Sequence, residues 1–246
     1  MPTINQATYN RLLAASPQAS LGRLLPCMKP VHLPLGKVIY EADQPIEFVY
    51  FPTDCIVSLL YVMADGASAE ISVVGFEGIT GIAVLMGANS STSQAVVQSA
   101  GTAFRLPIGE IRREFDHSPA MRAILLRYIQ TLITQMSQTA VCNRHHSIEQ
   151  QLCRWLLLSL DRLPGNELIM TQELIANMLG VRREGVTEAA GRLQRQRVIR
   201  YQRGRITIID RAKLEALCCE CYAVVKREAD RLQPCPGERC RGGYRE

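Results

Sequence analysis

The sequence has few histidines and no long apolar run. Only four of its 246 residues are histidine, and no apolar stretch reaches the about 18 residues that a membrane-spanning helix needs. No charged segment followed by an apolar one marks a secretory signal at its start. We therefore expect a cytoplasmic protein with no membrane partner.

The cysteines are numerous but do not suggest a disulfide framework. Their number is nine, which is odd, and no secretion signal accompanies them. Four stand singly in apolar contexts, as buried cysteines often do: Cys27, Cys55, Cys142 and Cys153. The other five gather in the motifs CCECY and CPGERC, namely Cys218, Cys219, Cys221, Cys235 and Cys240.

These C-terminal cysteines leave two interpretations open. They could form thiolates, a metal site or a regulatory disulfide. Alternatively, CCECY is the buried face of a last helix and the tail has no site. Cys142 also has a metal-like spacing to His145 and His146, but adjacent histidines point apart on a helix. We therefore predict no metal there and keep the five C-terminal cysteines only as metal candidates.

Charge is distributed unevenly along the chain. The overall hydrophobic content of 47% and charged content of 21% are ordinary for a globular protein. Residues 180–211, however, contain nine arginines and no lysine against three acids, a net charge of +6, whereas residues 1–110 have a net charge of −3. A basic C-terminal region is expected where phosphates must be neutralised.

Residues 171–194, TQELIANMLGVRREGVTEAAGRLQ, predict two short helices joined by a tight turn. The Thr171 hydroxyl can cap the first helix, and Gly180 can take the left-handed conformation that ends it. In the second helix an apolar face is expected to point inward, formed by Val186, Ala189, Ala190 and Leu193. This pattern is typical of a helix-turn-helix DNA reader.

The segment after this motif predicts a wing. Residues 195–209 give two short strands joined by an Arg203-Gly204 turn. The N-terminal end of a recognition helix reaches base edges in the major groove. The predicted DNA-binding residues are Thr171, Gln172, Arg182, Arg183, Glu184, Thr187, Glu188, Arg192, Arg203 and Arg205.

The N-terminal part of the chain predicts a β-rich domain. After a short helix interrupted at Pro17, residues 31–107 form short β-rich runs separated by turn residues, and Asp65-Gly66 is the strongest hairpin signal. Such runs favour a closed antiparallel barrel or a jelly roll. The predicted fold class is therefore α+β, a jelly-roll barrel followed by a long helix and a winged helix-turn-helix.

A helix of about 25 residues is predicted from Ser118 onwards. Its stripe at alternating spacings of four and three resembles a coiled-coil seam, formed by Met121, Leu125, Tyr128, Leu132, Gln135 and Thr139. We predict that this stripe is the interface of a homodimer. The alternative is that it packs only on the barrel.

The chain is thereby divided into four segments. They are a sensor barrel with its short helix (1–117), a dimerisation helix (118–143), a winged helix-turn-helix (144–217) and a cysteine-containing helix and tail (218–246). Residues 143–147, NRHHS, are the predicted hinge between the dimerisation helix and the reader.

This order of elements, together with MTQELIANMLGVRREGVTEAAGRLQRQRVI, resembles the Crp/Fnr family of bacterial transcription regulators from about Leu21 to Leu217. The resemblance implies a cyclic-nucleotide-binding-type barrel, a dimer helix, and two winged helices on palindromic double-stranded DNA, with RNA polymerase as a partner. The Arg-Glu pair of the family's recognition helix falls on Arg183 and Glu184. Arg can bond guanine O6 and N7, and Glu can accept from cytosine N4. Where the family carries a further Arg, this chain has Thr187-Glu188, so we expect a different half-site.

The sensor region departs further from the family. The chain keeps Gly75-Phe76-Glu77-Gly78 within VGFEGITGIAVLMG, and Ser93 and Gln94 complete the candidate ligand pocket. The loop 89–95, NSSTSQA, has no cation where cyclic-nucleotide binders carry an arginine. Since a buried phosphate needs a paired charge, cyclic AMP and cyclic GMP are disfavoured.

The sensed signal and the cofactor are left unassigned. Fnr-type iron–sulfur regulators carry an N-terminal cysteine cluster, and Cys27 and Cys55 are too sparse for it. A metal or iron–sulfur cofactor is therefore possible but unsupported. One alternative function is a redox- or metal-responsive regulator that uses the C-terminal cysteines.

Two other function classes remain. A cupin metalloenzyme needs histidines on barrel strands, and only His32 lies near one. A barrel that docks proteins beside a non-functional reader is the third class. The leading prediction is a homodimeric transcription regulator and not an enzyme, with activation and repression both open.

Overall fold

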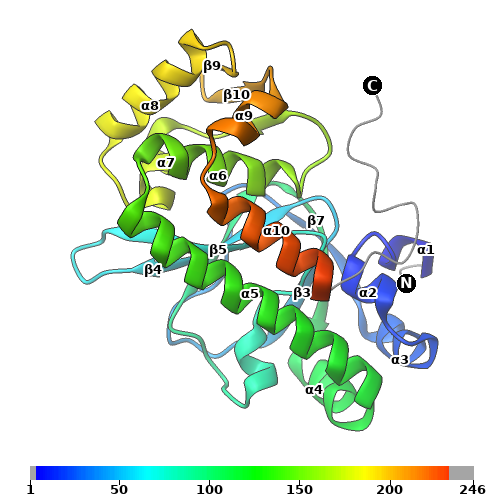
Figure 1. Ribbon diagram of the computed structural model, residues 1–246. Helices are drawn as coiled ribbons and strands as arrows, with labels where there is room; N and C mark the ends of the chain where they lie inside the picture. Colours follow the sequence, from blue (N-terminus) through cyan, green and yellow to red (C-terminus); the bar gives the residue numbers. More distant parts are fainter. Residues whose placement is uncertain (1–3, 233–246) are drawn as a thin grey trace.

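The computed structural model describes residues 4–232. It arranges them as two antiparallel sheets, a long helix across them, and a helical region with a small third sheet (Figure 1). Three short helices open the chain, α1 (Ile4–Ala7), α2 (Arg11–Ala15) and α3 (Gln18–Leu24), followed by a 3₁₀ turn η1 (Leu25–Cys27). The prediction of one short helix is therefore corrected, although the interruption at Pro17 is where the sequence places it, at the N-cap of α3.

Seven strands form the two sheets. They are β1 (Lys29–Leu33), β2 (Val38–Tyr40), β3 (Phe48–Pro52), β4 (Ile56–Val62), β5 (Ser68–Val74), β6 (Gln94–Ser99) and β7 (Gly101–Pro107). One sheet has the order β1-β7-β3 and the other β2-β6-β4-β5. A 3₁₀ helix η2 (Ile82–Met86) lies between β5 and β6.

The predicted closed barrel is wrong in one respect, because the sheets do not close into a barrel. No strand pairing among the described residues joins them. The chain passes from one sheet to the other at Ala100, between β6 and β7, so two consecutive strands belong to different sheets. The predicted hairpin at Asp65-Gly66 is confirmed: Gly66 has a φ of +85°, and the Asp65 carboxylate accepts from the amide of Ala67 at 2.9 Å.

After α4 (Ile108–His117), the long helix α5 runs over Pro119–His145. The Ser118 side chain caps it by accepting from the amide of Met121 at 3.3 Å, and a proline occupies the first helical position, where its missing N–H costs nothing. Residues 143–145 are helical rather than a hinge. The break falls at His146 and Ser147, where the backbone is extended.

A capping box of Ser147 and Gln150 starts the next helix, α6 (Ile148–Leu160). Then follow β8 (Glu167–Ile169), α7 (Gln172–Leu179), α8 (Arg183–Arg195), β9 (Ile199–Gln202) and β10 (Arg205–Ile208), with the sheet order β8-β10-β9. The strand β8 is missing from the sequence prediction. Two more helices, α9 (Arg211–Leu217) and α10 (Glu220–Leu232), end the described chain, and α10 lies alongside α5 (Figure 1).

The helical region is packed onto the four-stranded sheet. Ile56, Leu60 and Val73 of that sheet share one apolar cluster with Trp155, Leu156 and other residues of α6. Met121, Leu125 and Tyr128 of α5 belong instead to the cluster between the sheets and the N-terminal helices. Helix α6 therefore packs between the four-stranded sheet and the helix-turn-helix, and this burial of apolar side chains holds the reader in position. No helix among residues 4–232 is long and apolar enough to cross a membrane.

Candidate nucleic-acid interface

The predicted helix-turn-helix is present at α7 and α8. The Thr171 side chain caps α7 by accepting from the amide of Leu174 at 3.2 Å. Gly180 ends the helix with φ 64° and ψ 35°, the left-handed conformation that favours glycine. A side chain at position 180 would also come within 3.2 Å of Ala69 on the β5 edge. Glycine therefore serves both the turn and the close contact with the sheet.

The second helix, α8, turns its apolar side inward as predicted. Val186, Ala189, Ala190 and Leu193 are buried. Its N-cap and first two turns expose side chains of the DNA-binding set, which are Arg182, Arg183, Glu184, Thr187 and Glu188. The N-terminal end of this helix thus presents two cations and several hydrogen-bonding groups on one accessible surface.

One contact connects the two helices within this surface. The Thr187 hydroxyl lies 2.7 Å from Gln172 Oε1 and 3.0 Å from the carbonyl oxygen of Arg183. Gln172 stands at the first position of α7, so the start of α7 is held against the second turn of α8. Thr171 itself remains exposed beside it.

Arg192 lies on a different side of the helix from the exposed cations. It pairs with Glu149 of α6 and, at 2.7 Å, with Glu188 one turn earlier. Two carboxylates therefore hold this guanidinium, and it fastens α8 to α6. Glu188 is correspondingly half of an ion pair and not an isolated acid facing the DNA side.

The predicted wing is formed by β9 and β10. Arg203 and Gly204 make the two-residue turn between them, with φ values of +50° and +75°. Both values are positive, as a type I′ hairpin turn requires. Arg203 is exposed at the tip, whereas Arg205 forms an exposed ion pair of 2.6 Å with Glu167 of β8.

The six residues predicted as the dimer seam are buried within the chain. Their exposed fractions are 6% or less, for Met121, Leu125, Tyr128, Leu132, Gln135 and Thr139. The polar pair at the end of the stripe faces the reader: Gln135 Oε1 lies 3.4 Å from Arg162, and the Thr139 hydroxyl accepts from Arg154 at 3.2 Å. The assignment of these six side chains to a dimer interface is therefore wrong, because the packing within the chain, mainly by β5 and the N-terminal helices, already covers them.

A different side of α5 is exposed. It carries the apolar side chains of Leu126, Ile133 and Val141, which are 48%, 47% and 47% exposed. Six of the exposed positions are spaced alternately by three and four residues along the helix, at Ala123, Leu126, Gln130, Ile133, Ser137 and Ala140, and Val141 is exposed beside the last of them. We call this set the outer α5 stripe.

The GFEG turn also has its contacts inside the chain. Glu77 forms an ion pair of 2.7 Å with Arg162, which follows α6, and the two side chains are only 15% and 10% exposed. A Cβ at Gly75 would lie 2.8 Å from Arg162, and a Cβ at Gly78 would lie 2.1 Å from the Tyr128 hydroxyl. Both glycines therefore permit side chains of α5 and of the reader region to touch this turn.

The other predicted pocket residues are distributed elsewhere. Ser93 is buried and lies 2.9 Å from Ser91 through their hydroxyls, while Gln94 donates to Glu41 at 2.5 Å. Phe76 is half-buried, and its carbonyl accepts from the amide of Arg11 at 2.6 Å. A surface cleft lies instead between residues 39–48, Tyr50 and Arg105, and none of the six predicted pocket residues lines it.

Two cysteines of CCECY lie next to Cys142 and His146, where the sequence predicted no metal. Cys219 and Cys221 lie beside Cys142 and His146, whereas Cys218 packs at the edge of this group and His145 is exposed. Cys235 and Cys240 lie outside the described residues. Of the remaining histidines, His32 is exposed on β1 and His117 is at the end of α4. None of the four histidines lies between the two sheets, where a cupin-type metal centre would need them.

A buried polar network connects the four-stranded sheet to α6. Ser58 Oγ lies 2.5 Å from Glu70 Oε2 and 2.9 Å from Gln98 Oε1, and Gln98 Nε2 donates to Ser159 of α6 at 3.0 Å. Burial raises the pKa of the Glu70 carboxyl to about 7, and the Ser58 hydrogen bond opposes this only in part. Glu70 therefore holds a proton in the folded chain at pH values where an unfolded chain has lost it.

This pKa predicts a stability that falls with rising pH. Between about pH 4.5 and 7 the folded form binds the extra proton, so the free energy of unfolding decreases as pH rises through this window. Because glutamine does not titrate, the free energy of unfolding of Glu70→Gln should rise by about 3 kcal/mol relative to that of the parent between pH 4.5 and pH 7. Urea unfolding at pH 4.5, 6 and 7.5 measures this. Asp230→Asn, an exposed change on α10, should follow the parent profile, and parallel profiles for Glu70→Gln would contradict the assignment.

Comparison with known proteins supports the interpretation of this region. A family model for the Crp-like helix-turn-helix domain matches residues 150–217. The transcriptional regulatory protein btr of Bordetella pertussis is 26% identical over 200 residues, which cover 76% of this chain and 80% of that protein. A global nitrogen regulator of Nostoc sp. is 24% identical over 183 residues, covering 70% of this chain and 82% of that protein.

Solved structures share the overall fold of this chain. FixK2 from Bradyrhizobium japonicum has a TM-score of 0.65 at 16% identity, covering 78% of this chain and 98% of that one. A transcriptional regulator of the CRP family from Thermus thermophilus has a TM-score of 0.64 at 17% identity, covering 76% of this chain and 95% of that one. At these identities the likeness shows a common fold over about three quarters of the chain.

Proposed function

We propose that the chain, whose residues 150–217 match the Crp-like helix-turn-helix family model, is a DNA-binding transcription regulator of the Crp/Fnr type that acts as a homodimer and reads a palindromic operator with α8. The observation that carries the proposal is the surface at the start of α8. There Arg182, Arg183 and Glu184 are exposed above a buried apolar face. A helix placed this way inserts its N-terminal residues into a major groove.

The side chains on this surface suit direct reading of bases. Arg183 can donate to guanine O6 and N7 together, and Glu184 can accept from cytosine N4. Gln172 and Thr187 are held together at the same end, where hydroxyl and amide groups can bond a phosphate or a base edge. The exposed Arg203 at the wing tip supplies a further cation for the DNA backbone. Specificity is thus assigned to α8 and positioning to the wing.

The dimer is proposed to form through the outer α5 stripe. Its positions have the three–four spacing of a coiled-coil seam, and its apolar members lie exposed along a helix of 27 residues. A second copy of the same helix would cover them. Two readers related by a twofold axis then match two half-sites one helical turn, or a multiple of it, apart.

The stripe predicts the effect of single charges. Leu126→Glu or Ile133→Glu should convert the dimer to a monomer at micromolar concentration, because each places two carboxylates in an apolar contact between the chains. Sedimentation equilibrium measures the mass. Val62→Glu is the matched control, since Val62 is 48% exposed on β4, away from the stripe. Dimers that persist in both stripe variants would contradict this interface.

We propose that this regulator does not respond to a cyclic nucleotide. The loop before β6 has no cation, and the nearby Arg112 already donates to the carbonyls of Val84 and Ala88 and to Asn89 Oδ1. The residues around η2 that face the core are apolar, among them Ile79, Val84 and Leu85. A cyclic phosphate entering there would be buried without a paired charge.

The remaining partners follow from this role. A regulator that binds an operator acts in the cytoplasm of a bacterial cell, and RNA polymerase is its expected second partner. No enzymatic step is assigned to the chain.

The experiment that tests the proposal is selection of duplexes from a random library by the purified dimer. Enrichment of an inverted repeat is expected, whereas a bound pool that stays as random as the input would refute the proposal.

A further inference from the structure

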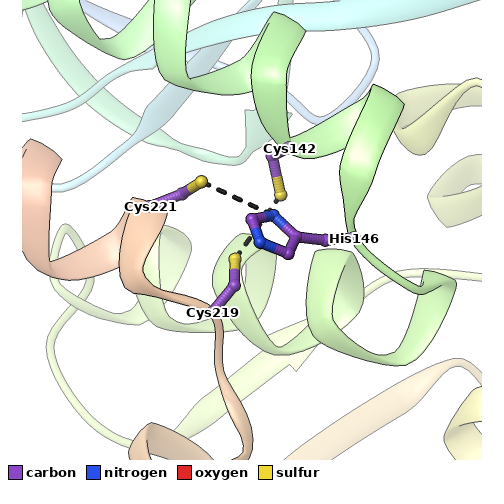
Figure 2. Close-up of side chains that lie close together, drawn as sticks. All are labelled: Cys142, His146, Cys219 and Cys221. Carbon is purple, nitrogen blue, oxygen red and sulfur yellow. Dashed lines mark hydrogen bonds between the residues drawn. The ribbon is translucent and has the colours of Figure 1, made fainter.

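Four side chains with metal-binding atoms converge at the end of α5. Their ligand atoms lie within 4.8 Å of one another, in the set Cys142, His146, Cys219 and Cys221. Figure 2 shows the four pointing toward a common centre, two from the end of α5 and two from the start of α10. We propose that they form a tetrahedral zinc site that fastens α10 to α5.

The distances suit a single ion. Cys142 Sγ lies 3.6 Å from Cys219 Sγ, and Cys221 Sγ lies 3.6 Å from His146 Nδ1. In a tetrahedral site with Zn–S bonds of about 2.3 Å, two sulfurs lie about 3.8 Å apart. A cube of iron and sulfide needs far more room between its ligands than this set leaves. The Cys142–Cys219 separation also exceeds a disulfide bond of about 2.05 Å.

The chemistry of the donors agrees with the distances. Three thiolates and one imidazole are a common structural zinc set, because soft sulfur ligands with tetrahedral geometry select this metal. All three cysteines are at most 5% exposed, so the site is closed to substrate. Three thiolates with one zinc leave a net negative charge. The guanidinium of buried Arg154 donates to the Thr139 hydroxyl at 3.2 Å, one turn before Cys142 on α5, and its positive charge would offset part of this charge.

The second nitrogen of His146 also has a suitable partner. Its Nε2 lies 3.3 Å from the Glu220 carboxylate, while Nδ1 faces the sulfurs. A metal-bound histidine commonly donates its other N–H to a carboxylate or carbonyl, which fixes the ring orientation. The backbone is held too, because Gln151 Nε2 donates to the carbonyl of His146 at 2.9 Å. The imidazole is therefore positioned from both sides.

The local backbone explains why only one of the two adjacent histidines takes part. His146 is the C-cap of α5 and is extended, with φ −107° and ψ 153°, and its amide still bonds the carbonyl of Cys142 at 3.0 Å. His145 ends the helix and points to solvent. The chain then enters α6 through Ser147. A metal at this point would thus hold the junction from which the reader departs.

Metal analysis of the purified full chain tests the site. We expect one zinc per chain, no visible chromophore, and an X-ray absorption spectrum with three sulfur and one nitrogen neighbours. Cys219→Ser and Cys221→Ser should lose the zinc, whereas Cys218→Ser and Cys27→Ser should keep it. Iron with sulfide, a metal-free reduced protein, or zinc lost only when Cys235 and Cys240 are replaced would overturn the proposal.

The two histidines offer a matched pair of variants. His146→Ala should weaken zinc binding about 10- to 100-fold or more, and His145→Ala should leave it unchanged. Competition with a chromophoric chelator measures both affinities. Equal affinities in the two variants would exclude His146 as a ligand. The X-ray absorption spectrum of the unmodified chain tests the site even if a cysteine variant fails to fold.

Hydrogen exchange tests separately whether the metal holds α10 against α5. Chelation should speed exchange of the α10 amides at least about tenfold while β4 and β5 stay protected, and unchanged α10 exchange would contradict the fastening. On the premise of the proposed function, chelation should also weaken operator binding about tenfold. A stoichiometric zinc in a protein that binds no DNA would refute the proposed function and leave the metal site standing.

Discussion

Replacement of Arg183 by alanine is expected to weaken specific operator binding strongly. Each bidentate contact of an arginine with guanine contributes about 1–3 kcal/mol of discrimination, and a dimer makes two. The loss of affinity for the selected duplex should therefore be roughly 30-fold or more. The side chain is exposed at the start of α8, so its removal leaves the buried face of the helix intact. Fluorescence anisotropy with a labelled duplex measures the change.

Two comparisons make this result specific. Arg227→Ala removes an exposed arginine from α10, away from the reader, and should leave operator affinity unchanged. Binding of Arg183→Ala to a scrambled duplex should decrease far less than binding to the operator, because non-specific affinity depends on phosphates. If Arg183→Ala and the parent bind the operator equally, the chain is better described as a docking module with a non-functional reader.

Loss of Arg162 is expected to be the most destabilising single change outside the apolar core. Arg162→Met leaves the Glu77 carboxylate largely buried and unpaired, which costs about 3–5 kcal/mol of unfolding free energy. The same guanidinium donates to the carbonyl of Leu158 at 2.6 Å. The two sheets and the reader would therefore lose a connection between the GFEG turn and the end of α6. Urea unfolding at neutral pH measures the change.

A double variant distinguishes two causes of the lost stability, an unpaired Glu77 carboxylate and the lost packing of the Arg162 side chain. Glu77→Gln combined with Arg162→Met should recover most of the lost stability, because no unpaired carboxylate remains. Arg231→Met is the control, since Arg231 is 66% exposed in its pair with Glu228, and its free energy of unfolding should stay close to that of the parent. If the double variant is as unstable as Arg162→Met alone, the unpaired carboxylate is not the cause of the lost stability.

The reader was predictable from sequence because its signals are local. The Thr171 cap, the left-handed Gly180 and the buried Val186 face are each decided within a few residues. The wing turn at Arg203-Gly204 follows the same logic. Strand β8 escaped prediction because it is only three residues long, and its partner β10 lies about forty residues further on.

The errors share a different physical cause, which is contact between distant segments. The spacing of Met121 and Leu125 identified an apolar face on α5 but not what covers it. Glu77 and Arg162 are 85 positions apart, and Cys142 and Cys219 are 77 apart. Both pairs meet only because the reader packs on the sheet and α10 folds back along α5. Periodicity and caps carry no information about such pairings.

Methylation interference on the selected operator tests most directly whether α8 reads bases in the major groove. A methyl group on guanine N7 blocks the bond that Arg183 would make there. We predict that methylation of one guanine in each half-site prevents binding of the parent, with the two guanines one helical turn or a multiple of it apart. The same methylation should not affect the residual binding of Arg183→Ala. Binding that tolerates N7 methylation throughout the operator would contradict the assignment of sequence reading to α8.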